Sequence, residues 1–401
     1  MQRSGKNATQ LSYVLGLLRV TGKFMCQVCS ADSLEAVESY TSLPRVTSDC
    51  KSWPAGGKLT VCHTCGACQK IPDAAWFDDI ERIYGAYQIY QLSEGSEQII
   101  FSADGKAAPR SRLLADFVRQ TVKLPTKGKL IDIGCGNGGA LRTFSQTLPE
   151  WQLYGTELTD ASLEDLKQLP NFVRLFTGRQ PEIKERFELV TMIHSLEHMP
   201  APAKTLSEAA DLLDDGGKLF VEIPDVETSP FDLIVADHLV HFSRATLRLL
   251  TERAGFSVQV LRNDMLPKEN TLIAVPGSVT PTKSDAAAGI ALIKRNVGWL
   301  SALVDLATKT AMSAKSFGLF GTSISGTWLD GVLREKIAFF VDEDESRIGK
   351  TIGGRPIVSP KDTPKDATVF VPLIPSVAKK VIERLSCWRV RFVAPPALVN
   401  Q

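Results

Sequence analysis

The cysteines of this chain are spaced like metal ligands. Six of the eight cysteines lie between Cys26 and Cys68, and four of them form two Cys-x-x-Cys pairs. The paired residues are Cys26, Cys29, Cys62 and Cys65. Each pair can place two thiolates on one ion, and two pairs complete the tetrahedral coordination that zinc prefers. We therefore predict a structural zinc ion at these four residues, because four protein ligands leave no position for a substrate.

Alternatives to this ligand set remain among the neighbouring residues. Cys68 repeats the three-residue step and could replace Cys65, while Cys50 and His63 are further candidates. The cysteines could also be unliganded structural residues. A secreted disulfide framework is not expected, since the chain is long and contains no recognisable export signal.

A glycine-rich turn is the second signal of chemistry. In Leu130–Gly138 an apolar strand leads into a run of alternate glycines. These glycines are Gly134, Gly136 and Gly138. They permit a tight turn and a close backbone approach to a ligand, and the helix expected to begin near Gly139 offers free N–H groups. Dinucleotide-binding proteins share this pattern. Asp132, however, would repel a pyrophosphate and could accept a hydrogen bond from an amino group, which favours a cationic ligand.

The next predicted strand ends in a carboxylate, Glu157. It follows the glycine turn by about twenty residues, where a carboxylate can accept both hydroxyls of a ribose. The combination resembles the cofactor motifs of class I methyltransferases, which bind S-adenosylmethionine. Phe187–His198 and Leu212–Glu222 resemble the later motifs of the same fold. The resemblance implies a Rossmann-like α/β domain that binds the cofactor through the three glycines and through Asp132, Glu157, His194 and Glu197.

Histidines supply a candidate base. Four of the five histidines fall in this part of the chain: His194, His198, His238 and His241. A lone histidine is more often a core or surface residue, but these four are expected near the carboxyl edge of one sheet. Asp237-His238 is the best candidate, because a nearby carboxylate can orient an imidazole whose pKa suits neutral pH.

Alternating strands and helices must position these residues. Four apolar segments predict a parallel α/β sheet, at Lys129–Ile133, Gln152–Thr156, Glu188–Ile193 and Lys218–Ile223. A linker at Val275–Ser284 and a helical pattern at roughly Ala286–Ser313 precede a second strand–helix alternation. We expect a zinc-binding segment with an aromatic-rich connection over residues 1–104, a methyltransferase domain over 105–280 and a C-terminal Rossmann-like domain over 281–401.

Composition narrows the range of partners. The net charge is +1, which gives no electrostatic reason to expect a nucleic acid or an anionic membrane. The apolar stretch near the N-terminus is too short to span a bilayer, so we expect no membrane span and a cytoplasmic protein. The oligomeric state is not indicated.

From Cys26 onward the chain is similar to the bacterial sugar C-methyltransferases of deoxysugar biosynthesis. The shared features are Cys-x-x-Cys-Gly, the aromatic stretch Ile83–Tyr90, and the C-terminal segments Phe317–Thr322, Phe339–Asp344, Ile348–Lys350 and Arg355–Pro360. The family pattern His-Glu-His-Leu-Ser-Tyr-Phe-Ser corresponds here to Ala236–Ser243. His238 is kept, whereas Asp237 replaces the Glu, Ala236 the first His and His241 the Tyr.

This resemblance implies C-methylation of a nucleotide-linked 4-keto deoxysugar. His238, oriented by Asp237, would remove a proton beside the ketone, and Tyr87 or Tyr90 would donate a hydrogen bond to the enolate oxygen. O-methylation of a sugar or polysaccharide hydroxyl by the same His238 is the alternative. A degenerate methyltransferase-fold scaffold is the second alternative, which the intact Asp132 and Glu157 disfavour. The C-terminal domain is expected to wall the sugar site, and the sequence does not establish whether it binds a nucleotide.

Overall fold

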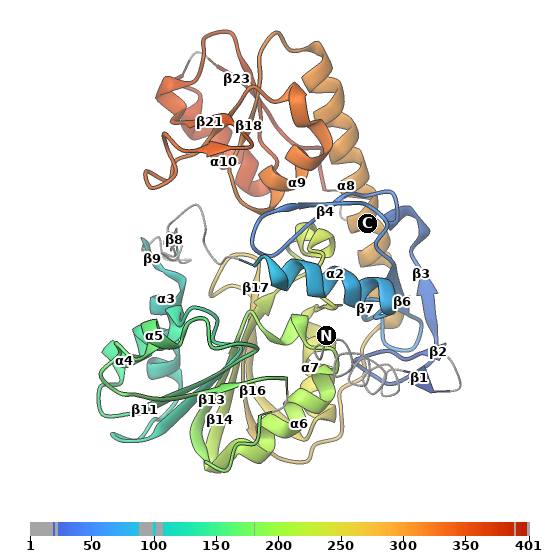
Figure 1. Cartoon of the computed structure of the whole chain (residues 1–401). Helices are drawn as coiled ribbons and strands as arrows, with labels where there is room; N and C mark the ends of the chain where they lie inside the picture. The colour runs from blue at the N-terminus through green and yellow to red at the C-terminus, as the bar shows by residue number, and fades with distance from the viewer. Residues whose placement is uncertain are drawn as a thin grey trace, which may run out of the picture.

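The computed structural model describes residues 19–20, 23–87, 99–101, 107–179, 181–388 and 390–398. Figure 1 shows the C-terminal part (orange to red) at one end and the central sheet (green to yellow) at the other, with the N-terminal segment (blue) alongside both. Three larger sheets organise these parts, with seven, six and four strands.

The central sheet confirms the predicted α/β class. Its seven strands have the order β12-β11-β10-β13-β14-β17-β16, which is 3-2-1-4-5-7-6 along the chain. Strand β17 runs antiparallel to both of its neighbours, and the other pairs are parallel. The strands are β10 (Lys129–Ile133), β11 (Gln152–Glu157), β12 (Phe172–Thr177), β13 (Phe187–Ile193), β14 (Leu213–Pro224), β16 (Phe256–Arg262) and β17 (Glu269–Pro276). All four predicted strands are present.

Helices and the N-terminal segment cover the two faces of this sheet. The helices are α3 (Arg110–Thr121), α4 (Gly139–Thr147), α5 (Leu163–Leu166), α6 (Pro202–Leu212) and α7 (Arg244–Arg253). Successive residues of a strand point to opposite faces. Leu130 of β10 therefore packs with Leu114 of α3, whereas Ile131 belongs to the core that contains Leu206 of α6. Cys26 and Trp76 belong to this second core, so the N-terminal segment helps to cover that face.

A short strand from the central part of the chain completes the sheet of the N-terminal segment. Its four-stranded sheet has the order β15-β7-β6-β3, formed by β3 (Leu34–Ala36), β6 (Leu59–Cys62), β7 (Cys68–Lys70) and β15 (Val240–His241). Helix α2 (Ala74–Gly85) follows, and the Asp73 side chain caps it by accepting a hydrogen bond from the Trp76 N–H. Short two-stranded pairs complete the described segment: β1 (Arg19–Val20) with β2 (Lys23–Phe24), β4 (Arg45–Val46) with β5 (Ser52–Trp53), and β8 (Ile99–Phe101) with β9 (Ala107–Pro109).

The C-terminal part contains the second predicted α/β unit. Its six-stranded sheet has the order β20-β21-β19-β18-β22-β23. The strands are β18 (Phe317–Phe320), β19 (Phe339–Val341), β20 (Thr351–Ile352), β21 (Arg355–Val358), β22 (Thr368–Phe370) and β23 (Arg391–Val393), and the helices are α9 (Ile324–Leu333) and α10 (Pro375–Leu385). The Asp342 carboxylate accepts hydrogen bonds from the Thr322 N–H and hydroxyl, which closes the glycine turn after β18.

Helix α8 (Ala286–Ser313) matches the predicted long helix and packs against both other parts. Judged by length and composition alone, this helix could cross a membrane, and it is the one helix among the described residues that meets this test. In the structure its residues Val297 and Leu300 share a core with Val46 of the N-terminal segment and Trp328 of α9. The Trp328 indole also donates a 2.7 Å hydrogen bond to the Pro44 carbonyl. The helix therefore serves here as a core element between the N-terminal and C-terminal parts.

Candidate functional site

The glycine turn leads from β10 into α4 at the carboxyl edge of the central sheet. Gly134, Gly136 and Gly138 all have positive φ, a backbone region that residues with a Cβ rarely adopt. A Cβ at Gly134 would lie 2.7 Å from the Ser195 Cβ. Glycine is therefore required there by backbone conformation and by space. The same contact places the turn directly against the segment that follows β13.

Two acids flank this turn, as the motif predicts. Glu157 ends β11, and its Oε1 accepts a 2.7 Å hydrogen bond from the Gly136 N–H. Asp132 lies in β10 with 2% of its surface exposed and accepts a 2.7 Å hydrogen bond from the Thr191 hydroxyl. Burial raises the pKa of Asp132 to about 7 despite that hydrogen bond.

His194 lies just after β13 within a group of charged residues. Its Nε2 lies 2.9 Å from Glu269 Oε2, and Glu269 also pairs with Arg110 at 2.8 Å. Burial would lower the pKa of His194, but the Glu269 and Glu197 carboxylates together outweigh it and the pKa rises to about 10. Burial and the nearby Glu269 raise the pKa of Glu222 well above its usual value. These shifts favour the charged form of His194 and the neutral form of Glu222.

His238 is held by a carboxylate other than the predicted one. Its Nδ1 lies 2.6 Å from Oδ1 of Asp232, which belongs to the 3-10 turn η4 (Pro230–Ile234). The expected pairing of His238 with Asp237 is wrong, because adjacent residues in this loop point in different directions. His238 is 6% exposed and Asp232 is 5% exposed, so the pair is shielded from water.

Asp232 also orients a second imidazole. His241 Nδ1 lies 2.8 Å from Asp232 Oδ2, and His241 Nε2 lies 3.0 Å from the Lys70 ammonium. Burial and the nearby Lys70 lower the pKa of His241 to about 4, and burial lowers that of Lys70 to about 7. Burial would raise the pKa of Asp232, but His241 and His238 hold it well below its usual value. Asp232 is thus a charged acceptor for two imidazoles.

Asp237 instead joins the N-terminal segment to the turn after β13. It accepts hydrogen bonds from the Ser48 N–H at 2.9 Å and the Ser48 hydroxyl at 2.5 Å. The Ser48 hydroxyl also lies 3.0 Å from the Tyr87 hydroxyl. On the other side, Asp237 Oδ2 lies 3.5 Å from His198 Nδ1, which is 3.1 Å from the Tyr84 hydroxyl. Tyr87 is therefore beside the predicted site, and the other predicted tyrosine, Tyr90, lies outside the described residues.

Backbone pairing fixes the loop that carries His238. Val240 and His241 pair with Gln69 and Cys68 across the β15–β7 ladder. The Lys70 ammonium donates to the carbonyls of Val235 at 2.6 Å and His238 at 2.8 Å. His238, the candidate base from the central part of the chain, is thus positioned by the N-terminal segment.

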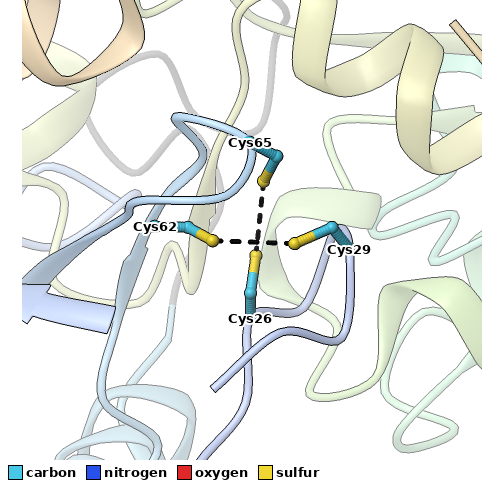
Figure 2. A group of neighbouring side chains, drawn as sticks. All are labelled: Cys26, Cys29, Cys62 and Cys65. Carbon is cyan, nitrogen blue, oxygen red and sulfur yellow. Dashed lines mark hydrogen bonds between the residues drawn. The ribbon is translucent and has the colours of Figure 1, made fainter. Parts of the chain in front are cut away.

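The four predicted zinc ligands converge on one point. Figure 2 shows the sulfur atoms of Cys26, Cys29, Cys62 and Cys65 pointing toward one another from two separate loops. The Sγ atoms of Cys26 and Cys65 are 3.6 Å apart, as are those of Cys29 and Cys62. Disulfide sulfurs would be about 2.05 Å apart. Four sulfurs at about 2.3 Å from one zinc ion would be roughly 3.8 Å apart, so the donor set fits zinc.

Cys68, Cys50 and His63 do not join this cluster. Cys68 is buried in β7, and His63 instead pairs with Glu35 at the surface. Cys50 is not among the four cysteines whose sulfur atoms converge. The alternative ligands are therefore separate from the four converging sulfurs.

Comparisons with known proteins support a methyltransferase domain in the central part of the chain. A family model described as "Methyltransferase domain" matches residues 107–261. Ubiquinone biosynthesis O-methyltransferase of Saccharophagus degradans is 29% identical over 119 residues, or 27% of this chain and 48% of that protein. Ribosomal RNA small subunit methyltransferase C of Serratia proteamaculans is 26% identical over 244 residues, or 55% of this chain and 65% of that protein.

A solved structure gives a looser comparison. An S-adenosylmethionine-dependent methyltransferase from Clostridium acetobutylicum is 11% identical, covering 50% of this chain and 98% of that chain with a TM-score of 0.36. A TM-score of this size does not establish a shared fold. The chain spans about half the length of the first curated relative, at 48%. The matched residues and the strand order define the central part as a Rossmann-like methyltransferase domain.

Sequence reasoning missed three residues of this site: Asp232, Lys70 and Tyr84. Asp232 precedes His238 by six residues in an irregular turn, and no periodic pattern links them. Lys70 lies in the other part of the chain, and only the β15–β7 pairing brings it close. Tyr84 had a usable signal, because it lies with Tyr87 in the aromatic stretch Ile83–Tyr90.

Proposed function

We propose that this chain is an S-adenosylmethionine-dependent methyltransferase that C-methylates a nucleotide-linked 4-keto deoxysugar. The observation that carries the proposal is the shielded His238–Asp232 pair, next to the segment that packs against a methyltransferase glycine turn. We further propose that the chain divides into a zinc-binding segment (1–104), a methyltransferase domain (105–280) and a C-terminal domain (281–401) that walls the sugar site.

The residues around the glycine turn suit a sulfonium cofactor. When bound, S-adenosylmethionine supplies an electrophilic methyl group. Glu157 would accept the ribose hydroxyls, and Asp132 would attract the cationic end of the cofactor once it is ionised. His194 and Glu197 would form the wall of the pocket after β13, since Ser195 between them touches the glycine turn.

His238 is the proposed general base. With Nδ1 directed at Asp232, its Nε2 is left to remove the proton beside the sugar ketone. The charged Asp232 stabilises the imidazolium that forms. Tyr87 or Tyr84 would donate a hydrogen bond to the developing enolate oxygen. Close alignment of the nucleophilic carbon with the methyl group would provide much of the rate.

The four-cysteine cluster is proposed to hold a structural zinc ion. The cluster connects the loop at Cys26–Cys29 to the turn at Cys62–Cys65, directly before β7. Because β7 pairs with β15, zinc would act on the His238 loop only through the fold.

O-methylation of a sugar hydroxyl is the second candidate. The observation that favours it is His241, an imidazole that occupies the position of a tyrosine in the sugar C-methyltransferase pattern and binds Asp232. The relatives named as ubiquinone biosynthesis O-methyltransferases also favour oxygen as an acceptor. In this reaction His238 would remove a proton from an alcohol.

The proposed partner is a sugar substrate, without nucleic acid. The net charge of +1 supports this, because phosphate backbones are bound through an excess of Lys and Arg. The relative named as a ribosomal RNA methyltransferase, which is 26% identical, is the one comparison cited above that would favour a nucleic-acid substrate.

Product analysis tests the proposal. The zinc-loaded protein would be incubated with methyl-labelled S-adenosylmethionine and either a nucleotide-linked 4-keto sugar or its 4-hydroxyl analogue. The proposal predicts a new carbon–methyl signal by NMR with the keto sugar alone. A methoxy signal would establish the second candidate, and no transfer to either sugar would reject the sugar substrate class.

A further inference from the structure

A second buried cluster, separate from the cysteines, has the composition of a cation site. Glu197 and His198 lie in the turn η3 (Leu196–His198), and His238 lies in the loop before β15. One carboxylate oxygen and one nitrogen from each imidazole lie within 4.8 Å of one another. Ligand atoms on one transition-metal ion are at most about 4.4 Å apart, so only a small closure is needed.

The Glu197 carboxylate is buried and still has acceptor capacity. Glu197 is 1% exposed, and within the described part of the chain neither of its carboxylate oxygens has a hydrogen-bond partner. His194 Nδ1 lies 3.5 Å from Oε1, which is beyond hydrogen-bond range. His194 is also paired with Glu269 at 2.9 Å, so Glu197 shares this cation with a second carboxylate. A buried carboxylate with no hydrogen bond and one shared cation would be stabilised by a second cation.

Both imidazoles are arranged as metal ligands usually are. A metal-binding histidine generally donates its second N–H to a carboxylate or a backbone carbonyl. His238 Nδ1 is 2.6 Å from Asp232 Oδ1, and His198 Nδ1 is 3.0 Å from the Asp237 carbonyl. The two Nε2 atoms are left for a common ligand, and the ring centroids are 4.6 Å apart.

The neighbouring group of Asp232, His238 and His241 is a poorer site. Both Asp232 oxygens already accept hydrogen bonds from imidazole nitrogens, at 2.6 and 2.8 Å. The remaining nitrogen of His241 is 3.0 Å from the Lys70 ammonium. The remaining nitrogen of His241 therefore faces a cation, and we assign this group the role of supporting His238.

We propose that Glu197, His198 and His238 bind one divalent transition-metal ion through a carboxylate oxygen and two imidazole nitrogens. A mixed nitrogen and oxygen set suits Mn²⁺, Fe²⁺ or Zn²⁺ better than Mg²⁺, which prefers oxygen alone. The ion would polarise a keto or hydroxyl oxygen of the acceptor. The Nε2 of His238 cannot bind the ion and remove a proton at the same time. His238 would therefore act as the base only in the metal-free protein and as a ligand in the metal-bound protein. The site does not depend on the acceptor being a sugar.

Manganese binding tests this site without any turnover. Full-length protein whose cysteine cluster has been loaded with zinc would be titrated with Mn²⁺, and free Mn²⁺ would be measured by electron paramagnetic resonance. Thiolates select zinc over Mn²⁺, so the cysteine cluster should not compete. We expect one Mn²⁺ per chain and an affinity at least about tenfold lower in Glu197→Gln. Glu35→Gln is the matched control, because Glu35 and His63 form an exposed carboxylate–imidazole pair, and its affinity should equal that of the wild type.

Two results would overturn the proposal. One is a folded wild-type protein that binds no Mn²⁺, and the other is a Glu197→Gln variant with wild-type affinity. If Glu197→Gln does not fold, anomalous diffraction at the manganese edge from wild-type crystals replaces it. A peak between Glu197, His198 and His238 would support the site, and a peak elsewhere or none would reject it.

Discussion

At the scale of single residues, function depends on which carboxylate faces which imidazole. Asp237 is adjacent to His238 in sequence, yet it binds Ser48 and faces His198. Asp232 binds His238 and His241 with one oxygen each. Sequence adjacency suggested Asp237 as the partner of the proposed base, His238. It could not identify Asp232, because the irregular segment between Asp232 and His238 sets the directions of their side chains.

The first prediction concerns Asp232→Asn. The amide keeps the shape but loses the charge that stabilises the His238 imidazolium, so turnover should fall about a hundredfold or more. Steady-state rates of the wild type and the variant measure this effect.

Asp237→Asn is the matched control for this variant. It leaves the Asp232–His238 contact in place, so its turnover should fall much less than that of Asp232→Asn. Binding of S-adenosylhomocysteine should be unchanged in both variants and reports intact folding. An Asp232→Asn enzyme with the wild-type rate would remove Asp232 from its positioning role.

The second prediction follows from Asp132, whose pKa burial raises to about 7. Because this folded-state pKa lies above the usual value, the carboxyl is neutral at pH 6 and becomes charged as the pH passes 7. S-adenosylmethionine is a cation, so its affinity should rise by roughly five- to tenfold between pH 6 and 8. Calorimetric titration at several pH values would measure it.

Asp132→Asn serves as the comparison. It cannot gain the charge, so its affinity should be nearly independent of pH in that range. The same linkage makes Asp132 stabilise the fold less as the pH rises from about 4 to 7, since the folded state binds the extra proton there. A pH-independent affinity in the wild type would contradict the role given to Asp132.

At the scale of elements, pairing between short strands positions the residues of the candidate site. The central strands could be predicted from sequence because apolar runs followed by glycine turns mark buried parallel strands. Strand β12 could not, since it is an edge strand with an exposed Val173 and with Arg174 interrupting its apolar run. The two-residue strand β15 is too short for any pattern, yet it holds His238 in place.

The third prediction concerns the cysteine cluster. Cys62→Ser removes one of four thiolates, and structural zinc contributes on the order of 10 kcal/mol to folding. The variant should lose its zinc and melt at a lower temperature. Hydrogen exchange should become faster in β6, β7 and β15, because the cluster lies at the end of β6 and immediately before β7.

Cys387→Ser is the control for that experiment, since Cys387 is exposed and far from the cluster in sequence. Its zinc content and melting curve should match those of the wild type. A Cys62→Ser protein that has lost its zinc and keeps both wild-type melting and exchange would show that the metal has no structural role.

At the scale of the whole molecule, the site is assembled from two parts of the chain. Ser48, Lys70 and Tyr87 come from the N-terminal segment, whereas Asp232 and His238 come from the central part. The order of the three parts was predictable from motifs. Their mutual packing was not, because contacts such as that of Trp328 with Pro44 join residues far apart in sequence.

Calorimetric titration of the folded, zinc-loaded full-length protein with S-adenosylhomocysteine tests the central claim most directly. A methyltransferase must bind this product, and the proposed cofactor site lies at the glycine turn and Glu157. We predict one binding site of about micromolar affinity, weakened about tenfold or more in Glu157→Ala. A folded protein that does not bind S-adenosylhomocysteine, or a Glu157→Ala variant that binds it as tightly as the wild type, would contradict the account.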